Sequence, residues 1–464
     1  MSDELCFLSA AEAGRKIAAK ELSSVELTEA LMLRTEAIDG RLNAYIRVLG
    51  DQARAAAAAA DAALANGDPK GPLHGVPVAL KDIIDLAGVP TTAHSKLLLD
   101  HVATADAFVT AKLKQAGAVI TGKLSTHEFA IGGPAFDLPF PPARNPWNLE
   151  HHPGGSSSGA GTSVAAGMVP AALGSDTGGS VRNPASCCGI VGIKPTYGRV
   201  SRRGVIPLSF SLDNVGPLTR TVEDNALVLA AIAGHDPADP ASAPRAVDDY
   251  LTDLKRGVKG LKIGLIRHFY THDTVADDEM AAGIENAATC LAGLGAEVTE
   301  IRLPPLEQYA ACNRVILLSE AYAVHQKDLQ SRPESYSATT RRRLLPGAFI
   351  SAADYVNALR TREKLVAAFN NAMAGLDAAV TVSSHETPAN LSDMQEVERT
   401  YGRQARAPFN LIGNPAIAVP SGFHSNGLPL ALQIVGRAFD EAMCFRIAWA
   451  IEQSLDLGSR RPPI

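Results

Sequence analysis

Short apolar runs bounded by glycine and proline alternate with longer amphipathic stretches through most of the chain. The apolar runs have the length of strands buried on both faces of a sheet, and they include residues 75–80, 116–120, 171–174, 261–266, 296–299, 416–419 and 430–435. Between the first two, residues 106–115 have a helical pattern formed by Phe108, Val109 and Leu113, in which Val109 and Leu113 are four positions apart and share one helical face. The alternation predicts an α/β fold in one large domain, with a mixed β-sheet covered by helices on both faces.

The two remaining parts of the pattern are helical. Residues 1–70 contain a capping-box-like start at Ser23–Glu26 and an alanine-rich stretch over 53–65, so we expect an N-terminal helical layer before a core of residues 71–464. Residues 306–374 also have a helical pattern. We expect them to form an insertion that covers a cleft and supplies much of its wall, although their aromatic residues also suit an ordinary core.

Composition narrows the function classes. Of the 464 residues, 46% are hydrophobic and 20% charged, and the formal net charge is −6, so no basic surface for nucleic acid or an anionic membrane is indicated. The short cluster Arg341–Arg343 is expected on a solvated helix face.

The six cysteines have no metal or redox spacing and are expected to be reduced. No secretory leader is recognisable, which predicts a cytoplasmic protein. A homodimer is favoured by base rates alone.

Three segments carry the candidate chemistry. Lys81 ends an apolar run, Ser156 lies in the Ser-Gly cluster 154–159, and Ser180 follows Thr177, Gly178 and Gly179. A serine hydroxyl is a poor nucleophile until a base takes its proton, and a lysine among apolar residues can be that base. The glycines before Ser180 allow a tight turn, so the amides of Thr177, Gly178 and Gly179 are the predicted oxyanion hole.

Lys81 can act as a base only if its pKa falls far below the ordinary value of ~10.4. Its apolar neighbours predict such a fall, because burial can lower the pKa of a lysine by ~3 to 5 units. Asp82 and Asp85 would oppose this shift if they approached the ammonium group. We therefore expect both carboxylates to point away from Lys81, with Asp82 on the opposite face of the strand.

These segments resemble the amidase signature family. Blocks of similar sequence extend over roughly residues 25–455, among them 71–77, 144–148, 183–186, 192–199 and 413–416. The resemblance implies a Ser-cisSer-Lys triad in which Ser180 is the nucleophile, Ser156 follows a cis peptide bond and relays the proton, and Lys81 is the base. Ser157 would support the network, and Asp176 and Arg182 would pair to fix the nucleophile loop. Departures from the family pattern at Ile83, His94 and residues 383–388 affect the expected substrate preference rather than the triad.

Other interpretations of the same segments remain. On composition the Ser-Gly cluster suits a flexible linker, and Gly155–Gly159 also matches the G-x-S-x-G pattern, which would make Ser157 a nucleophile. The cluster lacks the lysine of a phosphate-binding loop. His151 and His152 lack a carboxylate at ligand spacing and are interpreted as loop residues, whereas His127 either borders the pocket or is structural.

The sequence thus predicts an amidohydrolase that cleaves a small-molecule carboxamide, carbamoyl or anilide bond through a serine acyl-enzyme. No cofactor or metal is expected, and neither nucleic acid nor membrane is an expected partner. The alternative is the glutaminase-type catalytic subunit of a tRNA-dependent amidotransferase complex, whose triad would be the same. An inactive scaffold is the third possibility.

Overall fold

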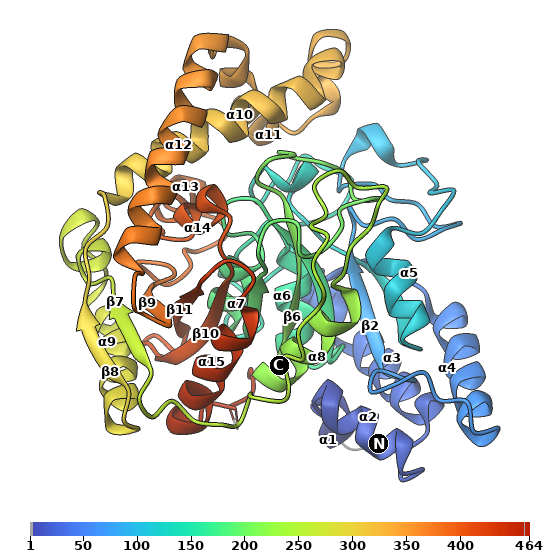
Figure 1. Cartoon of the computed structure of the whole chain (residues 1–464). Helices are drawn as coiled ribbons and strands as arrows, with labels where there is room; N and C mark the ends of the chain where they lie inside the picture. Colours follow the sequence, from blue (N-terminus) through green and yellow to red (C-terminus); the bar gives the residue numbers. More distant parts are fainter. Residues whose placement is uncertain (1–2, 459) are drawn as a thin grey trace.

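The protein is described by a computed structural model covering residues 3–458 and 460–464 (Figure 1). In this part of the chain an 11-stranded sheet has the order β1-β3-β2-β4-β6-β5-β10-β11-β9-β7-β8. The strands are β1 (Tyr45–Val48), β2 (Pro77–Lys81), β3 (Val119–Leu124), β4 (Ala171–Asp176), β5 (Val191–Lys194), β6 (Asn214–Thr219), β7 (Lys262–Leu265), β8 (Glu297–Glu300), β9 (Ala378–Val382), β10 (Ala416–Phe423) and β11 (Pro429–Gly436).

The sheet is mixed, as predicted. Strands β3, β2 and β4 are parallel to one another, as are β9, β7 and β8, whereas β1 and the central strands pair antiparallel with their neighbours. Alternate residues of β2 belong to different cores: Val78 and Leu80 to the larger one, and Ala79 to a second one. Because successive side chains of a strand point to opposite faces, both faces of β2 are buried.

Helices cover both faces of the sheet (Figure 1). The larger core includes side chains from α2 (Ala10–Ala18), α5 (Phe108–Gln115), α8 (Val222–Ile232), α9 (Asp278–Gly293) and α15 (Glu441–Leu455). The second core lies under α6 (Ser158–Ala165) and α7 (Arg182–Cys188) and includes Ile38 of α3 (Ser24–Leu42). The two short helices α6 and α7 each begin just after one of the predicted serine segments, so the sheet and this helix pair fix both segments in place.

The N-terminal layer differs from the prediction in one element. Residues 3–70 contain α1 (Asp3–Cys6), α2, α3 and α4 (Gly50–Ala65), but they also contain β1, which pairs with β3 at the edge of the sheet. The expectation of an entirely helical layer was therefore wrong for residues 45–48. This strand is only four residues long, and two of them are exposed, so it lacks the apolar run used to identify the other strands.

The helical insertion is present. It consists of α10 (Leu306–Ser331), α11 (Ala338–Leu344) and α12 (Ala352–Ala372), followed after β9 by α13 (Met394–Gly402) and α14 (Ala407–Ile412). Figure 1 shows α10, α11 and α12 projecting above one end of the sheet. No helix among the described residues has the length and apolar character needed to cross a membrane.

Candidate active site

Lys81 is the last residue of β2, and its side chain is fully buried. Its amine donates hydrogen bonds to the hydroxyl oxygens of Ser156, at 2.7 Å, and Ser175, at 2.9 Å. The predicted contact between Lys81 and Ser156 is therefore present. A role for Ser175 was not predicted, although it lies only five residues before Ser180, in the strand that leads into the Ser180 loop.

The electrostatic surroundings of Lys81 suit a base. Burial lowers its pKa from 10.5 to about 7, and the charges of Asp213 and Asp176 offset only part of this effect. Asp82 instead pairs with Lys123, with 2.9 Å between Nζ and the carboxylate, and both side chains are almost fully buried. As predicted, the carboxylate next to Lys81 in sequence points elsewhere, so the amine of Lys81 forms no ion pair among the described residues.

Ser156 lies in a tightly packed turn before α6. The peptide bond between Gly155 and Ser156 is cis, as the family resemblance implied. The amide of Gly155 donates to Asn183 at 2.8 Å, and a methyl group at position 155 would lie 2.2 Å from the ring of His127. Ser156 and its neighbours are fully buried and ordered by these contacts, which excludes a flexible linker.

Ser157 supports the neighbouring strand rather than acting as a nucleophile. Its hydroxyl donates to the carbonyl of Ser175 and accepts from the amide of Ser175, both at 3.2 Å. Its own amide donates to the carbonyl of Ser180 at 3.3 Å, which joins the two serine loops. The residues before this turn form only an isolated bridge at His151, so the strand required by the G-x-S-x-G interpretation is absent from 151–155.

The loop that carries Ser180 is fixed by Asp176. This carboxylate accepts hydrogen bonds from the amides of Gly179 (2.8 Å) and Val181 (3.1 Å), and it forms the predicted buried pair with Arg182 at 3.0 Å. Burial alone would raise the pKa of Asp176, but the charge and hydrogen bonds of Arg182, together with a hydrogen bond from Asn410, hold it below its usual range. Ser180 is 7% exposed and lies at the end of the loop, just before α7.

The contacts of Asp176 correct the predicted oxyanion hole. Because the amide of Gly179 already donates to Asp176, it is not free to bind an oxyanion in this arrangement. The amides of Thr177 and Gly178 form no hydrogen bond with other described groups, so these two remain candidates. The hydroxyl of Thr177 donates to Asp213 at 2.6 Å, which holds the start of the loop.

Four further side chains near Ser180 were not identified from the sequence. The hydroxyl of Tyr401 donates to the carbonyl of Gly155 at 3.3 Å; burial raises its pKa, and the Ser180 side chain is among the groups that offset part of this rise. The guanidinium carbon of Arg343 lies 5.3 Å from the centre of the Tyr401 ring. Arg406 packs against Gly179, and Asn313 lies near Gly178. They come from α10, α11, the end of α13 and the residue before α14. All four lie more than 100 positions after Ser180 in the chain, so no local motif could have identified them.

Two of these residues bear on the helical insertion. Asn313 belongs to α10 and Arg343 to α11, so the insertion does reach the nucleophile loop. Within the cluster Arg341–Arg343, Arg342 is exposed and pairs with Glu398, as expected of a solvated face. Arg343 differs from that expectation, because it is partly buried and lies over the Tyr401 ring; burial lowers the pKa of its guanidinium, and Tyr401 opposes this shift.

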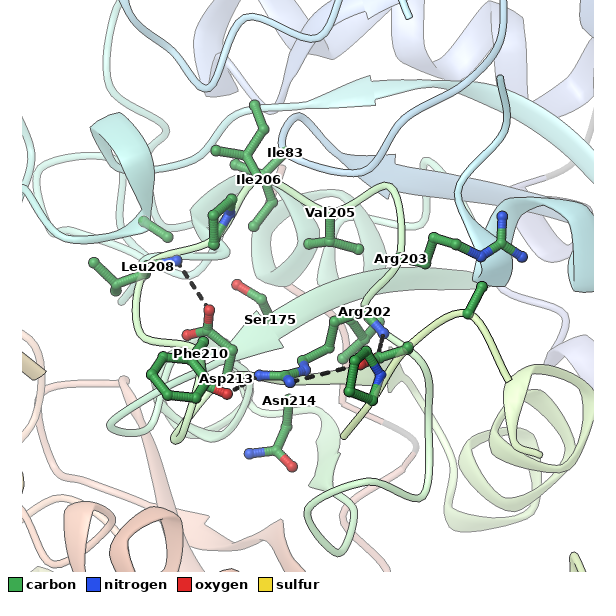
Figure 2. Close-up of a pocket in the computed structure, with 16 residues that line it drawn as sticks. Ile83, Ser175, Arg202, Arg203, Val205, Ile206, Leu208, Phe210, Asp213 and Asn214 are labelled. Atoms are coloured by element: carbon green, nitrogen blue, oxygen red, sulfur yellow. Dashed lines mark hydrogen bonds and ion pairs between the residues drawn. The ribbon is translucent and has the colours of Figure 1, made fainter. Parts of the chain in front are cut away.

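A cavity of about 230 Å³ opens beside the partners of Lys81 (Figure 2). Ser175 and Asp213 lie at its inner wall, and Figure 2 shows apolar side chains such as Ile206 and Val205 around it. Its lining comes mainly from the 202–215 segment and Ile83. No residue of 306–374 lines this cavity, and the expectation that these residues supply much of the wall of a cleft stays a prediction.

The histidines near the site are buried and neutral. Burial lowers the pKa of His127 well below its ordinary value, with Arg343 and Lys81 adding to the effect, and it lowers that of His152 to about 4. Over residues 3–458 and 460–464, no set of three or more His, Cys, Asp or Glu side chains is placed to hold a metal ion.

The site as a whole contains three groups suited to acyl transfer. They are the buried amine of Lys81, whose lowered pKa favours its neutral form, the hydroxyl of Ser156 hydrogen-bonded to it, and the hydroxyl of Ser180 on a loop where the amides of Thr177 and Gly178 are free.

Known proteins resemble the chain over nearly its full length. A family model described as Amidase matches residues 26–445. The A subunit of the glutamyl-tRNA(Gln) amidotransferase of Moorella thermoacetica is 42% identical, with 99% of each chain covered. A structure described as a vestigial protein complex that reveals the origins of an s-triazine catabolic enzyme has a TM-score of 0.91 at 33% identity, covering 98% of this chain and 100% of the other. The native peptide amidase of Stenotrophomonas maltophilia has a TM-score of 0.86 at 33% identity, covering 98% of each chain.

Proposed function

The chain belongs to the amidase family, and we propose that it hydrolyses a carboxamide bond through a covalent acyl-enzyme on Ser180. The observation that carries this proposal is the buried amine of Lys81, 2.7 Å from the Ser156 hydroxyl, with a pKa lowered to about 7 and no ion pair among the described residues. A lysine in this state accepts a proton at neutral pH, which a charged surface lysine cannot do.

The proposed reaction begins with proton transfer. The neutral amine of Lys81 takes the proton of Ser156 as Ser156 takes that of Ser180, and the Ser180 oxygen attacks the amide carbon. The amides of Thr177 and Gly178 stabilise the resulting oxyanion. The proton then returns through Ser156 to the leaving nitrogen, the C–N bond breaks, and ammonia or an amine leaves. Water attacks the acyl-enzyme by the same relay and releases the acid.

Replacement of the nucleophile tests this reaction. Ser180→Ala should abolish ammonia or amine release from a panel of primary amides and anilides and should prevent labelling by an acylating serine probe. Circular dichroism and thermal unfolding should remain those of the wild type, because Ser180 is small and lies at the end of a fixed loop. Ser392→Ala, at an exposed serine, serves as the matched control and should retain full activity. Normal turnover by Ser180→Ala would disprove the acyl-enzyme.

A second candidate concerns the setting of the reaction. Relatives at 38–42% identity are A subunits of glutamyl-tRNA(Gln) amidotransferases, and they favour a glutaminase-type subunit of such a complex over a stand-alone amidase. In that setting the ammonia released at Ser180 passes to a partner protein rather than to solvent.

Assays with and without a partner separate the two settings. A stand-alone amidase should hydrolyse simple amides at the same rate with or without added partner chains, ATP and tRNA. An amidotransferase component should hydrolyse glutamine slowly alone and much faster in the assembled complex. Pull-down from the native host followed by mass spectrometry would show whether stoichiometric partner chains accompany the protein.

A further inference from the structure

The cavity beside Lys81 extends from the interior to the surface. Ser175 and Ile83 line its buried end, at 4% and 1% exposure, whereas Pro207, Phe210 and Ala238 in the rest of its wall are exposed. At about 230 Å³ the cavity has room for several water molecules. Water from the surface can therefore approach the partners of Lys81 through this cavity.

The cavity reaches the base without reaching the nucleophile. Among the described residues, its lining includes Ser175 but neither Ser156 nor any residue of the 177–180 loop. The amine of Lys81 lies between two hydroxyl groups, 2.7 Å from that of Ser156 and 2.9 Å from that of Ser175. One hydroxyl belongs to the turn next to the Ser180 loop, and the other faces the cavity.

The Ser175 hydroxyl is placed to connect the amine with water. It accepts a hydrogen bond from Lys81, and no group among the described residues accepts its own hydrogen. The backbone of Ser175 is held by two hydrogen bonds with the Ser157 hydroxyl, so the side chain stays between the amine and the cavity. Figure 2 shows Ser175 among the cavity-lining side chains, where Asp213 and Asn214 offer polar partners for water.

Amide hydrolysis leaves Lys81 with a proton that must depart. Water and the amide give a carboxylic acid and ammonia or an amine, and an ordinary carboxylic acid has a pKa of ~4.3. The amine of Lys81, with a pKa of about 7, is the stronger base, so the acid passes its proton to Lys81 and leaves as a carboxylate. Lys81 in its ammonium form cannot begin another turnover. The released ammonia takes up one proton in the solvent, which balances the proton that Lys81 has to shed.

We propose that the hydroxyl of Ser175 carries this proton from Lys81 to water in the cavity and so returns the base to its neutral form after each turnover. An N–H bond of Lys81 breaks as an O–H bond forms on Ser175, and the original Ser175 hydrogen passes to water. This route stays available while an acyl group or product occupies the Ser180 side. The inference rests on the proposed hydrolysis at Ser180 and adds a proton exit to it.

The charges along this route favour movement towards the cavity. The charge of Asp213, at the inner wall, attracts a proton to this side of Lys81. At the outer wall, Arg202 lies 3.8 Å from Asp239, and Arg203 pairs at 2.8 Å with an aspartate outside the lining, so neither guanidinium is left without a carboxylate. The other titratable groups near Lys81 are Asp176 and His127.

A matched pair of variants tests the role of the hydroxyl. Ser175→Thr and Ser175→Val introduce side chains of the same shape, but only threonine keeps a hydroxyl. With enzyme in excess at about pH 8, where Lys81 starts neutral, both should complete a single turnover of a cleaved primary amide within about threefold of the wild-type rate. Under multiple turnover, Ser175→Val should be at least about tenfold slower than Ser175→Thr, because the proton stays on Lys81.

Narrowing the cavity gives a second test that leaves Ser175 in place. Val205→Phe enlarges a side chain of the cavity wall (Figure 2) and should lower kcat at least about fivefold without slowing the single turnover. Val247→Phe, the same change at an exposed valine that is not among the described lining residues, should have no effect. Added to Ser175→Val, Val205→Phe should lower kcat by less than about twofold more, because both changes close one route.

The comparison of single and multiple turnover separates the outcomes, with thermal unfolding used to verify that each variant is folded. A single turnover slowed as much as kcat in Ser175→Val would show that Ser175 only positions Lys81, and would overturn the proposed exit. Equal kcat values for Ser175→Thr and Ser175→Val, or for Val205→Phe and Val247→Phe, would overturn it as well. Failure of the wild type to cleave any amide would instead contradict the hydrolase proposal.

Discussion

Lys81 and Lys123 are buried lysines on adjacent parallel strands, yet their surroundings differ in one decisive respect. In the β2–β3 register, Lys81 is opposite Leu124 and Leu80 is opposite Lys123. Lys123 pairs with Asp82 at 2.9 Å and donates to the hydroxyl of Thr91 at 2.9 Å. Lys81 contacts two hydroxyl groups and no carboxylate. Burial lowers the pKa of both. For Lys123 an ion-paired carboxylate, Asp82, opposes the shift, whereas Asp213 and Asp176, which oppose it for Lys81, form no ion pair with that amine.

The comparison shows how one residue type serves two purposes within a single strand pair. A buried ion pair such as Lys123–Asp82 keeps both charges and holds the strand ends together, because breaking it would leave an uncompensated charge. A buried lysine with only hydroxyl partners tends to lose its proton. Asp82 follows Lys81 directly in sequence, so its pairing with Lys123 also removes from Lys81 the anion that would keep it charged.

The largest expected effect is on activity at Lys81. Lys81→Met keeps the length and apolar stem but removes the amine, so kcat/KM for any amide substrate should fall by at least about 10³-fold, within the range for a lost general base. Steady-state kinetics on purified protein would measure this. Lys123→Met, compared under conditions where it is folded, should lose less than about tenfold. Similar losses at both lysines would remove the functional distinction between them.

The next effect is on stability at Lys123. Lys123→Met leaves Asp82 buried without its partner and should lower the free energy of unfolding by about 3–5 kcal/mol. Urea unfolding followed by circular dichroism would measure the change. The double variant Lys123→Met/Asp82→Asn should recover much of the loss, since no unpaired charge remains. A single variant as stable as the wild type would show that the ion pair is not needed for folding.

Lys81→Met should have the opposite effect on stability. The folded pKa of Lys81, about 7, lies below its ordinary value of 10.5, so between these values the unfolded chain binds a proton that the folded protein lacks, and stability rises with pH. Removing the amine should raise the free energy of unfolding by about 2 kcal/mol at pH 7, less than the pKa shift alone implies because Ser156 and Ser175 lose their partner. The gain should shrink towards pH 10. A gain that grows with pH would contradict this account.

The smallest effect concerns the pH profile. Because the neutral amine of Lys81 is the active form, kcat/KM should rise with pH through about 7 and then level off. Asp213 is the charge that most strongly favours protonated Lys81, so Asp213→Asn should move this limb to lower pH by less than about one unit. Lys194, whose pKa burial also lowers to about 7, provides the control: Lys194→Met should leave the limb in place.

Much of the site was recoverable from local sequence because its parts are short and contiguous. An apolar run ending in Lys81, a turn rich in glycine before Ser156, and two glycines before Ser180 each prescribe their own backbone and burial. The strand at Tyr45–Val48 was missed because an edge strand that is half exposed has no distinctive apolar pattern. Ser175 was overlooked although it lies in the same run as Ser180, since nothing local shows which strand-end hydroxyl faces the neighbouring strand.

The sequence by itself determined the α/β class, the order of the segments and the presence of a lysine with apolar neighbours. Only the tertiary structure decided that Asp82 pairs with Lys123, that Asp176 occupies the amide of Gly179, and that Arg406 and Tyr401 lie beside Ser180. The first of these contacts joins residues at the ends of two neighbouring strands, the second depends on how the loop after β4 closes, and the last two involve residues more than 200 positions away along the chain. Their energies depend on burial and on which charges are left unpaired, quantities that exist only once the chain has folded.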